Sequence, residues 1–193
     1  LDFRNIESFE QEHIPHSVSL SPASLASFVP EKDELLIIVF SSQDTSALET
    51  IKNILRQKPF KAFLLSGGFE AWKNSGNQVL SAGDPNSILD QSKVVYITQE
   101  EIQNSDLDFI LLDVQTPENY RRKHVAGALH IPLDQLEKRS QEIPATKNIV
   151  VYGENEVIAF QGVVRLSGLN IITAKALRGN THLKPESIFL LEP

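Results

Sequence analysis

The sequence predicts an α/β protein made of two copies of one domain. Short β-branched runs, such as residues 35–40 and 149–152, alternate with segments of helical period, such as residues 44–56 and 157–166. This alternation is typical of a mostly parallel sheet whose strands are buried on both faces. An internal repeat of the same pattern indicates that the chain holds two such sheets.

The repeat covers most of the chain. Residues 1–9 (LDFRNIESF) align with residues 112–120 (LDVQTPENY). Further matches at nearly the same offset pair residues 13–18 with 124–129, residues 37–41 with 149–153, and residues 63–67 with 175–179. A repeat of this length indicates a duplicated domain rather than a solenoid of small units.

We divide the chain into domain 1 (residues 1–87) and domain 2 (residues 88–193). The polar segment 81–87 (SAGDPNS) suits a linker or an inter-domain loop. The second domain opens with a strand at residues 94–97 and a helix that Thr98 begins with a capping box. The first domain has no counterpart to this strand and helix, so we expect the natural chain to extend upstream.

Composition excludes several classes of function. The chain has 193 residues and contains no cysteine, so it can form neither a disulfide nor a thiolate metal site. A net charge of −7 argues against nucleic-acid binding. No apolar run approaches the length of a membrane span, and no signal pattern opens the sequence. We therefore expect a cytoplasmic protein with no metal, no cofactor, no nucleic-acid partner and no membrane partner.

The second copy resembles the rhodanese family. The resemblance rests on residues 112–120, on residues 124–132 (HVAGALHIP) and on residues 149–152 (IVVY). The first copy is similar to the same family in residues 13–17 (HIPHS) and residues 65–72 (LSGGFEAW). The resemblance implies two rhodanese-like three-layer α/β/α domains with mainly parallel five-stranded sheets, of which the first lacks its opening strand and helix.

In active members of this family, a cysteine begins a six-residue loop after the "VVY" strand, and an arginine usually closes that loop. Ser41 and Gly153 stand at the cysteine positions, and Ser46 and Ile158 stand at the arginine positions. A serine oxygen cannot form a persulfide and glycine has no side chain, so we expect no catalytic residue in either loop. The vestigial binding loops are Ser41, Ser42, Gln43, Asp44, Thr45 and Ser46 in the first copy, and Gly153, Glu154, Asn155, Glu156, Val157 and Ile158 in the second.

These observations favour a non-catalytic tandem module with a binding, regulatory or scaffolding role within a longer protein. The acidic side chains of Asp44, Glu154 and Glu156 would repel an anionic sulfur donor. The expected partner is another protein or a fused upstream domain; the resemblance implies that such modules occur fused to metallo-β-lactamase-fold thiol and persulfide enzymes. A small anion at the first loop is a further expectation.

Two alternatives stay open. The chain could be a sulfurtransferase-related or Ser41-dependent anion-processing enzyme domain, which would need a base within hydrogen-bond reach of Ser41. It could also be a spacer or dimerisation unit.

The other polar motifs are interpreted as structural. His13 and His124 have no second metal ligand at a suitable spacing, and Gly67 with Gly68 predicts a strand-to-helix turn. The same interpretation applies to Asp2 with Arg4, to Asp113 with Glu118, and to the basic run at residues 121–123.

Overall fold

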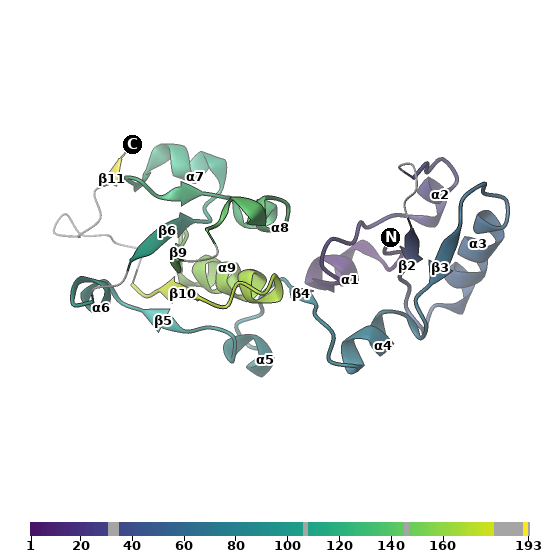
Figure 1. Ribbon diagram of the computed structural model, residues 1–193, viewed down its shortest axis with the longest axis horizontal. Helices are drawn as coiled ribbons and strands as arrows, with labels where there is room; N and C mark the ends of the chain where they lie inside the picture. The colour runs from purple at the N-terminus through teal and green to yellow at the C-terminus, as the bar shows by residue number, and fades with distance from the viewer. Residues whose placement is uncertain (31–34, 106–107, 145–146, 180–190, 193) are drawn as a thin grey trace. The chain divides into compact units, whose positions relative to one another are not determined.

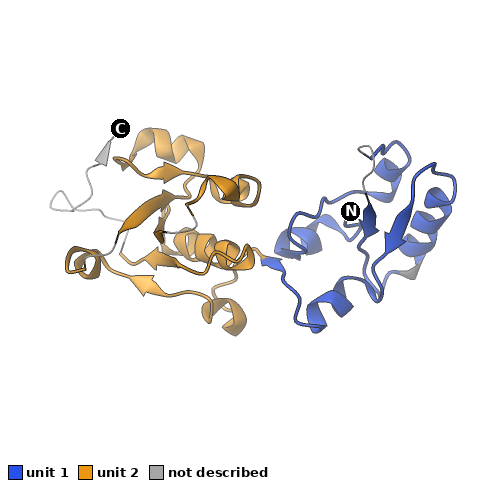
Figure 2. Ribbon diagram, viewed as in Figure 1, with its two compact units in different colours: residues 1–80 blue, residues 81–193 orange. Residues whose placement is uncertain are grey.

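The computed structural model describes two compact units. It covers residues 1–30, 35–105, 108–144, 147–179 and 191–192 (Figure 1). The units are Leu1–Leu80 and Ser81–Pro193, which Figure 2 shows in different colours. Each unit has a hydrophobic core of its own.

The second unit contains a five-stranded sheet in which all neighbouring strands run parallel. The strand order is β5 (Tyr96–Ile97), β10 (Ala174–Leu177), β9 (Asn148–Tyr152), β6 (Phe109–Asp113) and β8 (Leu129–His130). This sheet confirms the predicted α/β class and, for the second copy, the expected five parallel strands.

Helices cover both faces of this sheet. On one face, Val151 of β9 shares a core with Val163 of α9 (Glu156–Gly168). On the other face, Val150 shares a core with Ile102 of α6 (Gln99–Gln103). Because successive strand residues point to opposite faces, two cores around one strand define three α/β/α layers.

The remaining elements of the second unit are short. Helix α6 begins with the predicted capping box, in which Thr98 and Glu101 each accept the other's backbone N–H. Strand β7 (His124–Val125) pairs antiparallel with β11 (Leu191–Glu192). The other elements are α5 (Ile88–Gln91), α7 (Pro117–Arg122), α8 (Leu136–Arg139) and two 3₁₀ turns, η1 (Leu133–Gln135) and η2 (Ser140–Glu142).

The first unit repeats part of this arrangement. Strand β2 (Leu36–Ile38) pairs in parallel with β3 (Ala62–Leu64). Asp2 forms parallel bridges to Val39 on one side and to Ser19 on the other. The segment around Asp2 therefore lies beside β2 as β6 lies beside β9. Within the described ranges, the five-stranded sheet lies in the second unit, whereas β2 and β3 of the first unit form a two-stranded sheet.

Helices α2 (Pro22–Leu25) and α3 (Thr45–Leu55) cover one face of the first unit's sheet. Ile38 of β2 shares a core there with Leu25 and Ile51, and all three are fully buried. The other elements are α1 (Ile6–Gln11), β1 (Glu12–His13), α4 (Gly68–Asn74) and β4 (Leu80–Ser81), which lies at the division between the units.

The segment predicted as a linker is a hydrogen-bonded loop of the second unit. The Ser81 hydroxyl and the Asp84 N–H donate to the buried Asp90 carboxylate at 2.7 and 3.0 Å. The Gln161 amide on α9 donates to the Gly83 carbonyl at 3.2 Å. These contacts fix the segment against its own unit, while the predicted domain boundary itself stays a prediction.

Candidate functional site

The first predicted loop connects the β2 strand to helix α3. Asp44 is the N-cap of α3, and its carboxylate accepts a hydrogen bond from the Ala47 N–H at 2.9 Å. The last two predicted positions, Thr45 and Ser46, already belong to the helix, and Ser46 is exposed. Ser41 is partly buried. The loop therefore turns one hydroxyl inward at its start.

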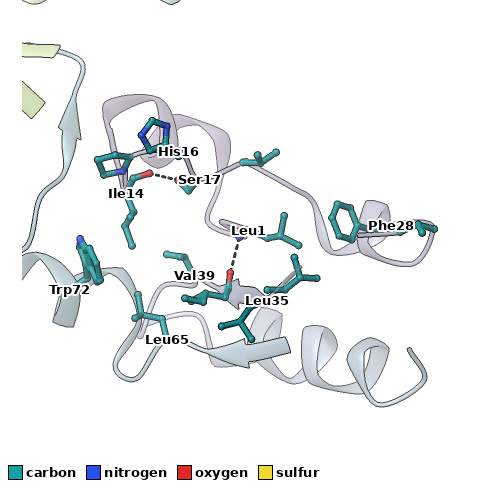
Figure 3. Close-up of a pocket in the computed structure, with 14 residues that line it drawn as sticks. Leu1, Ile14, His16, Ser17, Phe28, Leu35, Val39, Leu65 and Trp72 are labelled. Atoms are coloured by element: carbon teal, nitrogen blue, oxygen red, sulfur yellow. Dashed lines mark hydrogen bonds between the residues drawn. The ribbon is translucent and has the colours of Figure 1, made fainter. Parts of the chain in front are cut away.

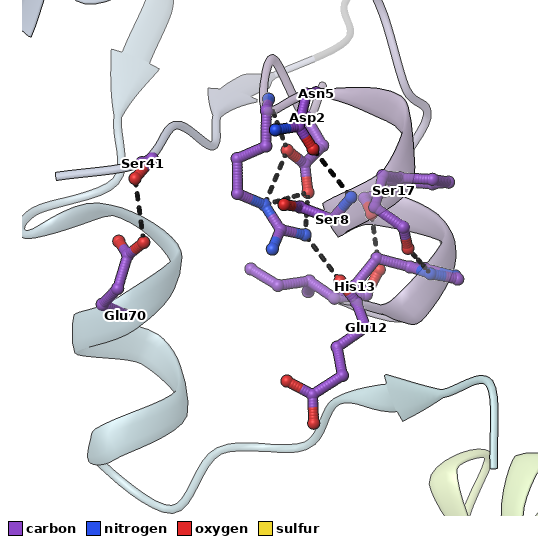
Figure 4. Close-up of polar contacts among 11 residues, drawn as sticks. Asp2, Asn5, Ser8, Glu12, His13, Ser17, Ser41 and Glu70 are labelled. Carbon is purple, nitrogen blue, oxygen red and sulfur yellow. Dashed lines mark hydrogen bonds and ion pairs between the residues drawn. The ribbon is translucent and has the colours of Figure 1, made fainter. Parts of the chain in front are cut away.

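Glu70, in the first turn of α4, accepts hydrogen bonds from the start of this loop, and Figure 4 shows its contact with Ser41. The Ser41 hydroxyl donates to Oε1 of Glu70 at 3.0 Å, and the Ser42 N–H donates to Oε2 at 3.0 Å. The Gln43 N–H donates to the Ser41 oxygen at 3.3 Å. The Glu70 carboxylate thus accepts hydrogen bonds from the first two residues of this loop.

The environment keeps Glu70 ionised. Burial raises the pKa of its carboxyl, but the hydrogen bonds from the Ser42 N–H and the Ser41 hydroxyl outweigh burial and leave the pKa below its ordinary value. A carboxylate with a lowered pKa is a weak base. The base that the Ser41-dependent alternative requires is therefore within reach, but it is poorly suited to remove a serine proton.

In the second loop, no space exists for a side chain at the cysteine position. A Cβ on Gly153 would lie 2.5 Å from Cγ2 and 2.9 Å from Cβ of Ile158. Ile158, at the arginine position, packs against the larger core of the second unit. Asn155 caps α9 by accepting the Ile158 N–H at 3.0 Å, and Val157 is exposed. The Ile158 side chain therefore fills the space that a side chain at residue 153 would need.

The two glutamates of the second loop accept backbone hydrogen bonds. Glu154 accepts from the Thr116 N–H and the Asn119 side-chain amide, both at 2.9 Å. Burial raises the pKa of Glu154, but these hydrogen bonds outweigh it and hold the pKa below its ordinary value. Glu156 accepts from the Gly179 N–H at 2.8 Å. Both carboxylates serve to fix neighbouring loops.

Each unit buries an aspartate in a matching position but satisfies it differently. Asp2 is fully buried and forms an ion pair with Arg4 at 2.7 Å. Asp113, equally buried, has Gln115 in place of the arginine; the amide donates at 3.0 Å, and the Tyr152 hydroxyl donates as well. Burial, and then the contact with Asp113, raises the pKa of Tyr152. These contacts agree with the structural interpretation of the aspartates.

The histidines are also held in structural contacts. His13 Nδ1 lies 2.9 Å from the Phe9 carbonyl, and its ring stacks on Phe9 at 4.3 Å. His124 Nδ1 lies 3.0 Å from the Tyr120 carbonyl, and its ring stacks on Tyr120 at 3.9 Å. Across the described residues, no three His, Cys, Asp or Glu side chains gather as metal ligands would.

The remaining predicted motifs lie in turns and on the surface. Gly67 and Gly68 have φ values of 71° and 68°, and a Cβ on Gly68 would lie 2.4 Å from the Phe40 carbonyl oxygen. Glu118 pairs with Arg122 at 2.7 Å, and both side chains are exposed. No helix in the described part of the chain is long and apolar enough to cross a membrane.

Both units carry a loop that leads from a parallel strand into a helix, which defines a tandem α/β domain protein. The chain belongs to the rhodanese-like domain family, whose model matches residues 1–75 and 97–179. The match confirms the resemblance seen in the sequence, and its two segments support a tandem pair.

Several relatives are sulfurtransferases. The thiosulfate sulfurtransferase GlpE of Coxiella burnetii is 32% identical over 73 residues, which cover 37% of this chain and 68% of GlpE. The uncharacterized protein YqhL of Bacillus subtilis is 36% identical over 61 residues, covering 32% of this chain and 48% of YqhL. The chain thus spans about half the length of that relative.

Two solved structures are also similar to this chain, with low sequence identity. A thiosulfate sulfurtransferase from Pseudomonas aeruginosa is similar with a TM-score of 0.41 and 19% identity, over 92% of this chain and 37% of that one. A rhodanese-related protein from Thermoplasma volcanium is similar with a TM-score of 0.42 and 13% identity, over 49% of this chain and 96% of that one.

Sequence reasoning missed Glu70, which it treated only as part of a family motif. A signal for it was present. The loops that follow two neighbouring parallel strands emerge at the same edge of a sheet, so the loop after β3 lies beside the loop after β2. An acidic residue in the first turn of the helix after β3 was therefore a candidate partner for Ser41.

Proposed function

We propose that the chain is a non-catalytic tandem rhodanese-like module that serves binding, regulation or scaffolding. One observation carries the proposal: both loops lack a thiol, and in each loop another side chain of the same unit contacts or fills the position where the thiol would lie. Glu70 accepts from the Ser41 hydroxyl and the Ser42 N–H of the first loop, and Ile158 fills the space beside Gly153 in the second.

The chemistry of sulfur transfer supports this proposal. A thiolate must attack the outer sulfur of thiosulfate, form a new S–S bond and release sulfite with the electron pair of the broken bond. This chain contains neither cysteine nor methionine, so no protein sulfur can accept the transferred atom. The Ser41 oxygen cannot replace it.

The proposal also concerns the partners of the module, which are another polypeptide and a small anion at the first loop. We propose a protein partner, or a domain fused upstream, for the module as a whole. A small anion would enter the first loop only after the Glu70 carboxylate has left, because that carboxylate already holds the Ser41 hydroxyl and the Ser42 N–H.

The test is an assay of the purified chain with thiosulfate and cyanide. We expect thiocyanate to form no faster than in buffer. Turnover above buffer that a Ser41→Ala change abolishes would overturn the proposal, since it would place catalysis at the loop.

The contact between Ser41 and Glu70 favours one second candidate function, hydrolysis by an oxygen nucleophile. Its test uses p-nitrophenyl acetate and p-nitrophenyl phosphate with Ser41→Ala and Glu70→Gln, and with Glu49→Gln on exposed α3 surface as the matched control. We expect all four proteins to match buffer. Hydrolysis lost in the first two variants and kept in the third would establish the hydrolase instead.

A further inference from the structure

We draw no further inference here: the strongest candidate, the apolar groove of the first unit that Leu35, Leu65 and Trp72 help to line (Figure 3), carries no proposal because nothing in the part of the chain that the structure describes shows what covers it.

Discussion

Ile158 occupies the space in which a side chain at residue 153 would begin. The Cγ2 atom of Ile158 would lie 2.5 Å from a Cβ on Gly153, and Ile158 is held in place by the core behind it. The side chains that positions 153 and 158 can carry are therefore coupled. A cysteine side chain at position 153 would therefore need a smaller side chain at position 158.

The first prediction follows from that coupling. Gly153→Cys should destabilise the protein by about 1–3 kcal/mol because the added side chain is overpacked, and it should transfer no sulfur. Gly153→Cys combined with Ile158→Ala should lose less stability than the sum of the two single changes. Urea denaturation of the three variants measures this. Strict additivity would show that the two side chains do not compete for space.

The second prediction concerns a thiol in the first loop. Ser41→Cys places a thiol beside the Glu70 carboxylate, which disfavours the thiolate and should raise the thiol pKa above its ordinary value of about 8.5. Adding Glu70→Gln should lower it. Because the chain has no other cysteine, the pH profile of iodoacetamide alkylation reports this thiol alone. Ser92→Cys, at an exposed position, is the matched control. A Ser41→Cys thiol that titrates below the control would contradict the inferred role of Glu70.

The third prediction is a pH dependence. The folded pKa of Glu154 lies below its ordinary value of 4.5, so the carboxylate stabilises the fold above that pH, and this contribution is lost as the pH falls through the lower folded pKa. Glu154→Gln should therefore be less stable than the wild type at pH 7, and the difference should shrink below pH 4.5. Urea denaturation across this range is the measurement. A difference that grows on acidification would have the wrong sign.

The fourth prediction tests the buried aspartate of the second unit. Tyr152→Phe removes the hydroxyl that donates to Asp113 and accepts from the Val125 N–H at 3.0 Å. Leaving these buried groups short of a partner should reduce the free energy of unfolding by about 1–3 kcal/mol. Tyr96→Phe keeps its ring under Arg178 and serves as the control. Equal effects of the two changes would mean that the Asp113 contact adds nothing.

In the first unit, the equivalent test breaks an ion pair. Arg4→Leu leaves Asp2 as a buried charge without its cation and should destabilise by about 3–5 kcal/mol. Arg4→Gln copies Gln115 of the second unit and should cost less, because the amide can still donate to the carboxylate. Thermal unfolding of the two variants gives the order, and the reverse order would refute the comparison between the units.

Much of the fold could be predicted from the sequence. The strand runs around Ile38 and Val151 and the capping box at Thr98 all have local signals, and the repeat supplied the duplication. The role of Glu70 had no local signal, since it depends on the pairing of β2 with β3. The exposure of Ile37 could not be predicted either, because the sequence of a strand does not show whether an apolar residue is buried or exposed.

The residue types at the two loop positions could be predicted from the sequence, but the packing around them could not. That Ser41 and Gly153 lack sulfur is a fact of the sequence, whereas the space that Ile158 takes is a fact of packing. Strand pairing adds a further detail. In the first unit the buried Asp2 pairs with Val39, and in the second the buried Asp113 pairs with Tyr152. The next residues, Phe40 and Gly153, therefore correspond, and Ser41 lies one position further into the first loop. Neither Phe40 nor Ser41 carries sulfur, so the first loop has no sulfur nucleophile whichever of the two corresponds to Gly153.

The intact mass of the chain after incubation with thiosulfate tests the central claim most directly. A persulfide would add one sulfur atom, which cyanide would remove, as expected for a sulfurtransferase such as GlpE run in parallel. We predict an unchanged mass for this chain. A cyanide-sensitive gain of one sulfur atom would contradict the account, because it would show that a group other than a thiol holds sulfur in this fold.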